Sequence, residues 1–480
     1  MMSLAALAGT GCPETHEDLM IEGLSADSRA LKPGYLFAAL PGTKVDGADF
    51  LDKAVAAGAV AALGAPGARE RATDLGLAFV ADEKPHRALA HMAARFYAPQ
   101  PELAVAVTGT NGKSSTVEFV RQIWAHLGVK GAALGTLGLK MSDGAAIDFG
   151  HTTPDPVGLH KALQRAAKNG VTALALEASS HGLDQFRMDG VKVAAAGFTN
   201  LGRDHLDYHP DLGAYRIAKL GLFDRVMDEG GTAIVDAGLD HETQTALQEI
   251  AKERRLKLLT IGGDYALGDV VPHGQGIRAA LEFAGDRYEV DLPLIGGFQL
   301  RNAIMAVALV HQTGGDLAGA VAALSHLKGV AGRMEQVARA KSGAPILVDY
   351  AHTPDALETV LKALRPHVAG SLCVVFGCGG DHDKGKRPLM GEIAHRLADL
   401  VIVTDDNPRT EDAALIRQEI LQASPDAHEI ADRAQAIEAA IAQAGAGDVV
   451  LLAGKGHESG QIIGDKVLPF SDADVARGAV

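Results

Sequence analysis

The residues best suited to chemistry form a glycine-rich stretch, Gly109-Thr110-Asn111-Gly112-Lys113-Ser114-Ser115. An apolar run at 104–107 precedes it, and apolar residues at helical spacing follow at 117–127, so we expect a strand, a loop and a helix. Such a loop directs backbone N–H groups and the positive helix end at one point, which suits phosphate. Lys113 would reach the outer phosphates, and the Ser114 hydroxyl would bind Mg²⁺. The stretch therefore predicts a nucleotide site.

The phosphate loop is a short variant, because Val107 stands where the full pattern has its first glycine. Taken alone, Gly-Lys-Ser is equally compatible with an ordinary helix start capped by serine. The preceding strand and the complete string favour the nucleotide site.

A magnesium ion needs further oxygen ligands, and Glu177 is a suitable carboxylate because it ends an apolar run at 171–176. His205 follows the next apolar run, Val193–Phe198, and could converge on the same site. Magnesium prefers oxygen to imidazole, so the residues alone favour a structural histidine and leave Glu177 as the candidate ligand.

The length of 480 residues favours about three domains. Two seams divide the chain, one at Pro99-Gln100-Pro101 and one at 329–332. They predict domains at 1–98, 99–331 and 332–480. The pattern of the middle segment predicts a parallel α/β sheet. Strands expected at 371–376, 400–404 and 449–452 alternate with helices, which predicts a second α/β sheet in the last segment. A strand at 35–40 is expected in the first domain.

Composition and charge restrict the class of protein. There are 45 basic and 60 acidic residues, and the net charge of −15 disfavours nucleic acid and anionic membranes as partners. The weakly apolar start lacks a positively charged segment, so no secretory leader is expected, and no run approaches about 20 apolar residues. Cys373 and Cys378 lack a second pair to complete a zinc site, so they are expected to be buried small residues. A cytoplasmic protein is expected.

Eight ordered strings between Asp27 and Glu458 resemble the Mur ligase family. They are T-G-T-N-G-K-S-S, E-A-S-S-H-G-L, N-L-G-R-D-H-L-D, Y-R-I-A-K, G-R-M-E, D-Y-A-H-T-P-D, F-G-C-G-G-D and D-D-N-P-R. The resemblance implies an α/β fold with an N-terminal UDP-binding domain, a central ATP-binding domain with a P-loop-type parallel sheet, and a Rossmann-like C-terminal domain for the incoming amino acid. It implies ATP, Mg²⁺ and a UDP-N-acetylmuramoyl-dipeptide as ligands, and we expect a monomer.

The resemblance also assigns roles to individual residues. Glu177 and His205 match magnesium ligands, which reverses the structural interpretation of the histidine. Lys219 matches a carbamylated lysine, although the residue alone would be taken for a solvated helix lysine. Ser28 matches a uridine contact. Asn302, Arg333 and Asp349 match ATP contacts, with Gln299 standing where the family usually has asparagine. The muramoyl-dipeptide contacts are matched by Thr152, Thr153, Ser179, Gln185 and Arg187.

The string Asp406-Asn407-Pro408-Arg409 follows a strand, and its composition alone would favour a turn. An arginine there could grip a carboxylate with two hydrogen bonds. In the resembling family this string marks enzymes that add meso-diaminopimelate, and Gly454 and Glu458 match contacts to its distal amino acid centre. His382 stands where the family has an arginine that contacts the diamino acid, and a histidine charged by its acidic neighbours could retain that contact.

Two other functions fit part of the pattern. Folylpolyglutamate synthetase resembles the Mur ligases in its phosphate loop, but the D-N-P-R string and the Asp27-Ser28-Arg29 stretch argue against it. An ATP-hydrolysing regulator or motor would explain the loop but neither the Lys219 string nor the C-terminal site. The favoured function is an ATP-dependent amide-forming ligase.

Overall fold

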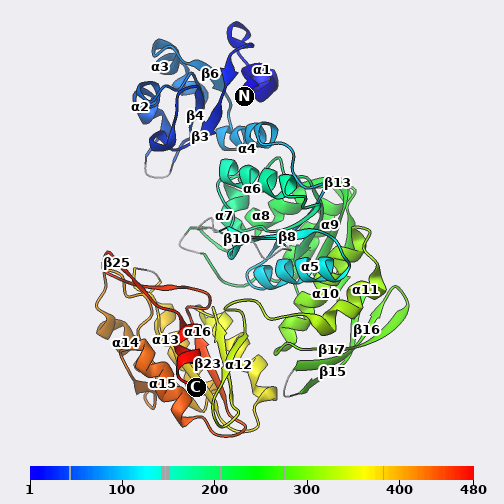
Figure 1. Ribbon diagram of the computed structural model, residues 1–480, viewed down its shortest axis with the longest axis vertical. Helices are drawn as coiled ribbons and strands as arrows, with labels where there is room; N and C mark the ends of the chain where they lie inside the picture. The colour runs from blue at the N-terminus through cyan, green and yellow to red at the C-terminus, as the bar shows by residue number, and fades with distance from the viewer. Residues whose placement is uncertain (43–44, 142–145, 148–151, 206–207, 274–275, 382) are drawn as a thin grey trace.

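The computed structural model describes residues 1–42, 45–141, 146–147, 152–205, 208–273, 276–381 and 383–480. The chain forms three units that follow one another along the long axis of the molecule, from the N-terminal unit through the central unit to the C-terminal unit (Figure 1). Each unit contains its own main sheet. None of the helices in the described ranges is long and apolar enough to cross a membrane.

The N-terminal unit has a four-stranded parallel sheet. Its strands lie in chain order: β3 (Gly23–Ser25), β4 (Tyr35–Ala39), β5 (Ala61–Gly64) and β6 (Ala78–Ala81). The strand predicted at 35–40 is confirmed as β4. Helix α4 (Pro85–Phe96) packs its apolar face on this sheet through Leu89 and Met92, and its C-terminal end leads into the central unit.

The central unit is built on a sheet of eleven strands. Its middle is parallel, as predicted, and the strands expected at 104–107, 171–176 and Val193–Phe198 are confirmed. The parallel strands, in spatial order, are β8 (Gly131–Gly135), β11 (Ala173–Glu177), β7 (Leu103–Thr108), β12 (Val193–Phe198), β13 (Met227–Asp236) and β14 (Lys257–Ile261).

Both edges of the central sheet include antiparallel strands, so the sheet that was predicted as parallel is mixed. One edge adds β9 (Gly138–Met141) and β10 (Ala146–Ile147) in antiparallel pairing. The other adds β15 (Tyr265–His273), which pairs in parallel with β14, and then β16 (Gly276–Phe283) and β17 (Asp286–Leu292) in antiparallel pairing. The physical reason is the length of the connections. Ala284 and Gly285, with φ of 54° and 88°, make a two-residue turn that can only join antiparallel strands.

Helices cover both faces of the central sheet, so its strands are buried on both sides. Val105 and Val107 of β7 pack with α5 (Lys113–His126) and α10 (Gly297–Gln312), whereas Ala104 and Ala106 pack with α6 (Pro156–Lys168). The period-two alternation of a strand explains this division. Two-sided burial also explains why the sequence shows continuous apolar runs rather than alternation.

The C-terminal unit has a six-stranded sheet, in which only β18 (Glu335–Arg339) is antiparallel to its neighbour. The other strands, in spatial order, are β19 (Pro345–Asp349), β23 (Val449–Ala453), β20 (Leu372–Phe376), β21 (Leu400–Val403) and β22 (His428–Glu429). The predicted strands agree within one residue at either end. Its helices are α12 (Pro354–Leu364), α13 (Lys386–Leu397), α14 (Ala413–Leu421), α15 (Arg433–Gln443) and α16 (Asp472–Gly478). Cys373 and Cys378 are free and buried, as expected.

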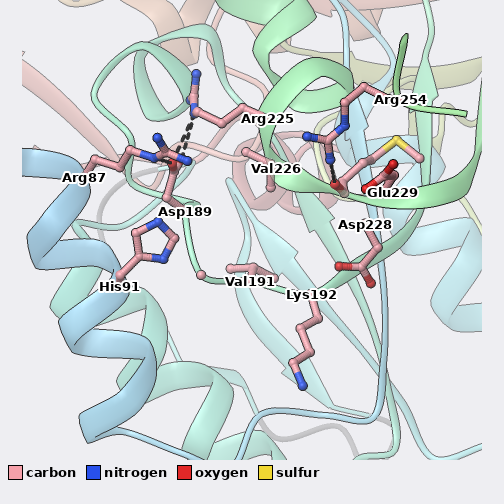
Figure 2. Close-up of a pocket in the computed structure, with 12 residues that line it drawn as sticks. Arg87, His91, Asp189, Val191, Lys192, Arg225, Val226, Asp228, Glu229 and Arg254 are labelled. Atoms are coloured by element: carbon pink, nitrogen blue, oxygen red, sulfur yellow. Dashed lines mark hydrogen bonds and ion pairs between the residues drawn. The ribbon is translucent and has the colours of Figure 1, made fainter. Parts of the chain in front are cut away.

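A buried carboxylate joins the N-terminal unit to the central unit. Asp189 is 2% exposed and accepts from Arg87 of α4 at 2.9 Å and from Arg225 at 3.0 Å. These residues line a pocket of about 300 Å³, in which both guanidinium groups point at the carboxylate (Figure 2). The Arg225 guanidinium also lies 4.5 Å from the centre of the Phe186 ring. The N-terminal and central units are therefore joined by ion pairs, and Arg225 of this junction also packs against Phe186.

Candidate active site

The phosphate loop connects β7 to α5, as the sequence predicted. Helix α5 begins at Lys113, and Gly112 caps it with a φ of 87°. A Cβ at Gly112 would lie 2.5 Å from Oδ1 of Asn302, and a Cβ at Gly109 would lie 2.0 Å from Oγ1 of Thr199. Both positions therefore require glycine. The first approach also places Asn302, the predicted ATP contact, against the loop.

Residues after β12 hold the loop in shape. Oδ1 of Asn200 accepts from the backbone N–H of Asn111 at 2.9 Å, and Nδ2 of Asn200 donates to the Asn111 carbonyl at 3.1 Å. The Thr199 hydroxyl donates to the same carbonyl at 2.6 Å. Sequence reasoning did not assign Thr199 or Asn200 to the site. Their position just after β12, which runs parallel to β7, could have identified them as residues of the site.

Two lysines meet at the carbonyl oxygen of Gly109. Nζ of Lys113 and Nζ of Lys219 each donate to it at 2.8 Å. Lys219 is 1% exposed, so the interpretation as a solvated helix lysine is wrong. Burial lowers the pKa of Lys219 well below its usual value, and the charge of Lys113 lowers it further. A larger fraction of Lys219 is therefore the neutral, nucleophilic amine.

The two predicted oxygen ligands of magnesium lie in contact. The Ser114 hydroxyl donates to Oε2 of Glu177 at 3.0 Å, and Oε1 of Glu177 accepts from the backbone N–H of Thr136 at 2.8 Å. Glu177 is 3% exposed at the end of β11. A buried carboxylate and a hydroxyl beside a phosphate loop form a donor set that fits Mg²⁺.

His205 lies among aromatic side chains beside the loop. Its ring centre is 4.8 Å from that of His181 and 6.3 Å from that of Tyr215, whose hydroxyl is 3.2 Å from Oγ1 of Thr110. Its backbone has a φ of 53°. Across the described ranges, no three or more His, Cys, Asp or Glu residues gather as a metal site. A role for His205 as a ligand remains a prediction.

Four of the predicted muramoyl-dipeptide contacts form one hydrogen-bonded group. Thr153 accepts from the Ser179 hydroxyl at 2.9 Å, and its carbonyl accepts from Arg187 at 2.7 Å. Oε1 of Gln185 accepts from the same guanidinium at 2.6 Å. The fifth, Thr152, lies 3.0 Å from the Thr136 hydroxyl, which connects it to Glu177. The group therefore lies next to the magnesium candidates.

Ser28, the predicted uridine contact, lies apart from that group in the N-terminal unit. It begins the short helix η3 (Ser28–Ala30), just after β3 ends, and Asp27 caps that helix by accepting from the Arg29 backbone at 2.9 Å. Ser28 therefore lies at the carboxyl edge of the N-terminal parallel sheet, where ligands of such sheets bind.

Arg333 and Asp349 occupy the junction of the central and C-terminal units. Nε2 of Gln299, from α10, donates to the Arg333 carbonyl at 3.3 Å. The two carboxylate oxygens of Asp349 accept from the backbone N–H groups of Met334 and Ala351, each at 2.8 Å. Burial raises the pKa of Asp349 to about 6, against the opposing effect of Arg333. Asp349 therefore organises this junction directly, and any contact with a ribose would share these oxygens.

The D-N-P-R string forms a loop after β21 rather than an isolated turn. The Arg409 guanidinium donates to the Gly380 carbonyl at 2.9 Å, and Nδ2 of Asn407 donates to Oε2 of Glu458 at 2.9 Å. A Cβ at Gly454 would lie 2.9 Å from Oδ2 of Asp406. The predicted diamino-acid residues are thus brought together from two loops. His382 lies outside the described residues.

A fully buried arginine ties these two loops to the end of the chain. The Arg433 guanidinium donates to the Ala453 carbonyl at 3.0 Å and to the Asp405 carbonyl at 3.4 Å. It also makes two hydrogen bonds of 2.7 Å to Asp472 of α16. Sequence reasoning missed both residues, because nothing local distinguishes them from surface helix charges.

Family models match three successive parts of the chain. The Mur ligase family catalytic domain matches residues 20–97, the Mur ligase middle domain matches residues 107–310, and the Mur ligase glutamate ligase domain matches residues 332–456. Among curated proteins, a UDP-N-acetylmuramoyl-L-alanyl-D-glutamate--2,6-diaminopimelate ligase from Bradyrhizobium diazoefficiens is 50% identical over 470 residues, which are 96% of this chain and 95% of the relative. The same-named protein from Caulobacter vibrioides is 50% identical over 463 residues, with 95% and 94% covered.

Solved structures show the same architecture. A structure of a UDP-N-acetylmuramoyl-L-alanyl-D-glutamate--2,6-diaminopimelate ligase superposes with a TM-score of 0.73 at 34% identity, covering 100% of this chain and 98% of the other. MurF ligase from Thermotoga maritima, solved with ADP, shares the fold at a TM-score of 0.65 and 21% identity, with 92% and 95% covered. With these matches and the site described above, the chain belongs to the Mur ligase family.

Proposed function

We propose that this Mur ligase joins meso-diaminopimelate to UDP-N-acetylmuramoyl-L-alanyl-D-glutamate and converts ATP to ADP and phosphate. The observation that carries the proposal is the placement of Arg409 and Glu458 on two neighbouring loops of the C-terminal unit, where each makes a hydrogen bond with Asn407. A guanidinium suits the distal carboxylate of the diamino acid, and a carboxylate suits its distal ammonium. The full-length likeness to diaminopimelate ligases supports the same substrate.

The first chemical step transfers the γ-phosphoryl group. A glutamyl carboxylate oxygen of the muramoyl substrate attacks the γ-phosphorus, the bond to the β-phosphate oxygen breaks, and ADP leaves with the bonding electrons. The product is an acyl phosphate. Lys113 and the N–H groups at the start of α5 stabilise the charge that develops on the phosphoryl oxygens, which is the main catalytic contribution in such transfers.

The second step forms the amide. The amine of the diamino acid attacks the acyl carbon, the carbon–oxygen bond to phosphate breaks, and the amine proton passes to solvent or phosphate. Water must be excluded, because it would hydrolyse the acyl phosphate. We propose boundaries between domains near residues 98 and 331, and closure at these seams would bring the third domain to the second.

Lys219 is proposed to act as a carbamate. Its neutral amine would attack dissolved carbon dioxide, form a nitrogen–carbon bond and release a proton. The depressed pKa of this buried lysine favours that reaction at neutral pH. The resulting anion would join Ser114, Glu177 and His205 in holding Mg²⁺, which when bound offsets the charge of the ATP phosphates.

Phosphate release tests the proposed chemistry. We expect release only when ATP, the muramoyl-dipeptide and meso-diaminopimelate are all present, and we expect Lys113→Ala to abolish it. Phosphate release without the muramoyl substrate would support a simple ATPase instead. An exposed lysine in the same unit, Lys252, offers the matched control, and Lys252→Ala should release phosphate at the wild-type rate.

A further inference from the structure

Lys455 is fully buried beside two residues of the proposed diamino-acid site. Its Nζ donates to Oδ1 of Asn407 at 3.0 Å and to Oε2 of Glu458 at 2.9 Å. Taking an ammonium group out of water is costly unless it is paired and hydrogen-bonded. Lys455 meets that requirement through these two site residues, which are its hydrogen-bond partners in the described part of the chain, and through the nearby buried carboxyl of Asp406.

The contacts of Lys455 close a ring with Asn407 and Glu458. Nδ2 of Asn407 donates to Oε2 of Glu458 at 2.9 Å, while Oδ1 of Asn407 also accepts from the backbone N–H of Ile462 at 2.9 Å. With two donors facing Oδ1, the Asn407 amide has only one orientation that satisfies its neighbours. Lys455 thereby fixes the direction of both polar side chains.

The ring leaves one oxygen of Glu458 for a ligand. Oε2 accepts from both Lys455 and Asn407, whereas Oε1 accepts no hydrogen bond from any described residue. The Glu458 side chain is 31% exposed, so it borders solvent while Lys455 lies behind it. The carboxylate of Glu458 is therefore fixed through Oε2, while its other oxygen, Oε1, can accept a hydrogen bond from a ligand.

We propose that Lys455 is a positioning residue that aims Oε1 of Glu458 at the distal ammonium of the diamino acid. This inference rests on the proposed function, because it takes Glu458 to be the group that pairs with that ammonium. Lys455 makes no contact with the substrate itself. Its effect is selectivity for an acceptor that carries a second amine, since an oriented carboxylate recognises a cation better than a mobile one.

Comparison of two acceptors isolates this role. 2-Aminopimelate has both carboxylates of diaminopimelate and lacks only the distal amine. We expect wild-type enzyme to prefer diaminopimelate in kcat/KM by roughly tenfold or more, as the loss of a charge-assisted hydrogen bond predicts. In Lys455→Met this preference should fall several-fold, mainly through KM for diaminopimelate, while KM for ATP stays unchanged.

Three further variants keep the test decisive. Lys455→Gln, which retains an N–H donor, should recover part of the preference and serves if Lys455→Met does not fold. Glu458→Gln should lose the preference in either background. Ile441→Ala, which opens a cavity in the same unit away from the loops, should lower stability and leave the preference intact.

The outcomes separate the inference from the proposed function. A wild-type enzyme that used neither diamino acid nor its analogue would overturn the proposed function and this inference with it. A wild-type enzyme that prefers diaminopimelate, with Lys455→Met or Lys455→Gln preferring it equally, would overturn the role of Lys455 alone. Equal losses for both acceptors in these variants would also contradict it, because a merely structural lysine would act in that way.

Discussion

Lys113 and Lys219 donate to the same carbonyl oxygen, that of Gly109, at 2.8 Å each. Two ammonium groups this close repel each other, and the charge of Lys113 is one cause of the lowered pKa of Lys219. Conversion of Lys219 to an anionic carbamate would replace this repulsion with attraction. The geometry thus gives the pair of lysines a reason to favour the neutral form of Lys219.

Lys219→Arg tests the carbamate. Arginine keeps a cation but forms no carbamate, so we expect kcat to fall by roughly a hundredfold or more, as for loss of a charge-stabilising group. The measurement is turnover at saturating substrates, with and without added bicarbonate. Lys257→Arg, at an exposed lysine of the central sheet, is the control. Undiminished turnover in Lys219→Arg would rule out the carbamate.

Glu177→Gln tests the magnesium site. The amide keeps the size of the side chain but removes its charge, so the magnesium concentration for half-maximal activity should rise by about tenfold or more. Asp236→Asn is the matched control, because Asp236 is also a buried carboxylate at a strand end but pairs with Arg301. If both variants kept the wild-type magnesium dependence, Glu177 would not be a ligand.

Asp189→Asn tests the junction of the first two units. Removing the charge leaves Arg87 and Arg225 without their shared carboxylate, and because their side chains are 42% and 21% exposed, we expect a loss of stability of about 1–3 kcal/mol. We also expect KM for the UDP substrate to rise with KM for ATP unchanged, because Phe186 lies between the substrate candidates Gln185 and Arg187. Asp228→Asn, in the same pocket, is the control. An unchanged KM for the UDP substrate would show that Asp189 contributes to stability and not to substrate binding.

His160 gives stability a pH dependence. Burial lowers the pKa of His160 from 6.5 to about 4. Between these values the unfolded chain binds a proton that the folded chain does not, so stability rises with pH across this window and is lost as pH falls through it. The free energy of unfolding changes by roughly 3 kcal/mol across this window. Urea unfolding of His160→Gln should show a weaker loss between pH 6.5 and 4, whereas exposed His241→Gln should match wild type. If the free energy of unfolding fell equally with pH in wild type and in both variants, His160 would not be the cause of the pH dependence.

Much of the fold could be predicted because its central strands are buried on both faces. The run Val193–Phe198 contains no polar residue, and the structure places a strand with those bounds. The edge strands were missed for the opposite reason. Gly268 and Asp269 interrupt the apolar residues of β15, and the structure leaves Val270 and Val271 of this strand 40% and 57% exposed.

The candidate site divides in the same way. The phosphate loop was predictable because its glycines, Lys113 and Ser114 are consecutive and act through local backbone geometry. Sequence reasoning missed Asn200, Arg433 and Lys455. Each of them makes a hydrogen bond with a residue that is far away in the sequence, so no local pattern marks it. Burial of a charged residue is decided by tertiary packing, and a single sequence carries no direct sign of it.

Arg409→Lys addresses the choice of amino acid. Lysine cannot reproduce two parallel hydrogen bonds to a carboxylate, so we expect KM for diaminopimelate to rise by about tenfold or more. KM for ATP should not change. Arg396→Lys, at an exposed arginine of α13 that pairs with Glu358, is the control. Equal KM values for diaminopimelate in the two variants would argue against a contact with Arg409.

A competition assay identifies the amino acid that the enzyme adds. Equal concentrations of meso-diaminopimelate and L-lysine are supplied with ATP and UDP-N-acetylmuramoyl-L-alanyl-D-glutamate, and the products are separated by mass. We predict that the diaminopimelate product dominates, because L-lysine lacks the distal carboxylate that Arg409 is proposed to bind. A product containing mainly lysine would overturn the assignment of diaminopimelate as the substrate.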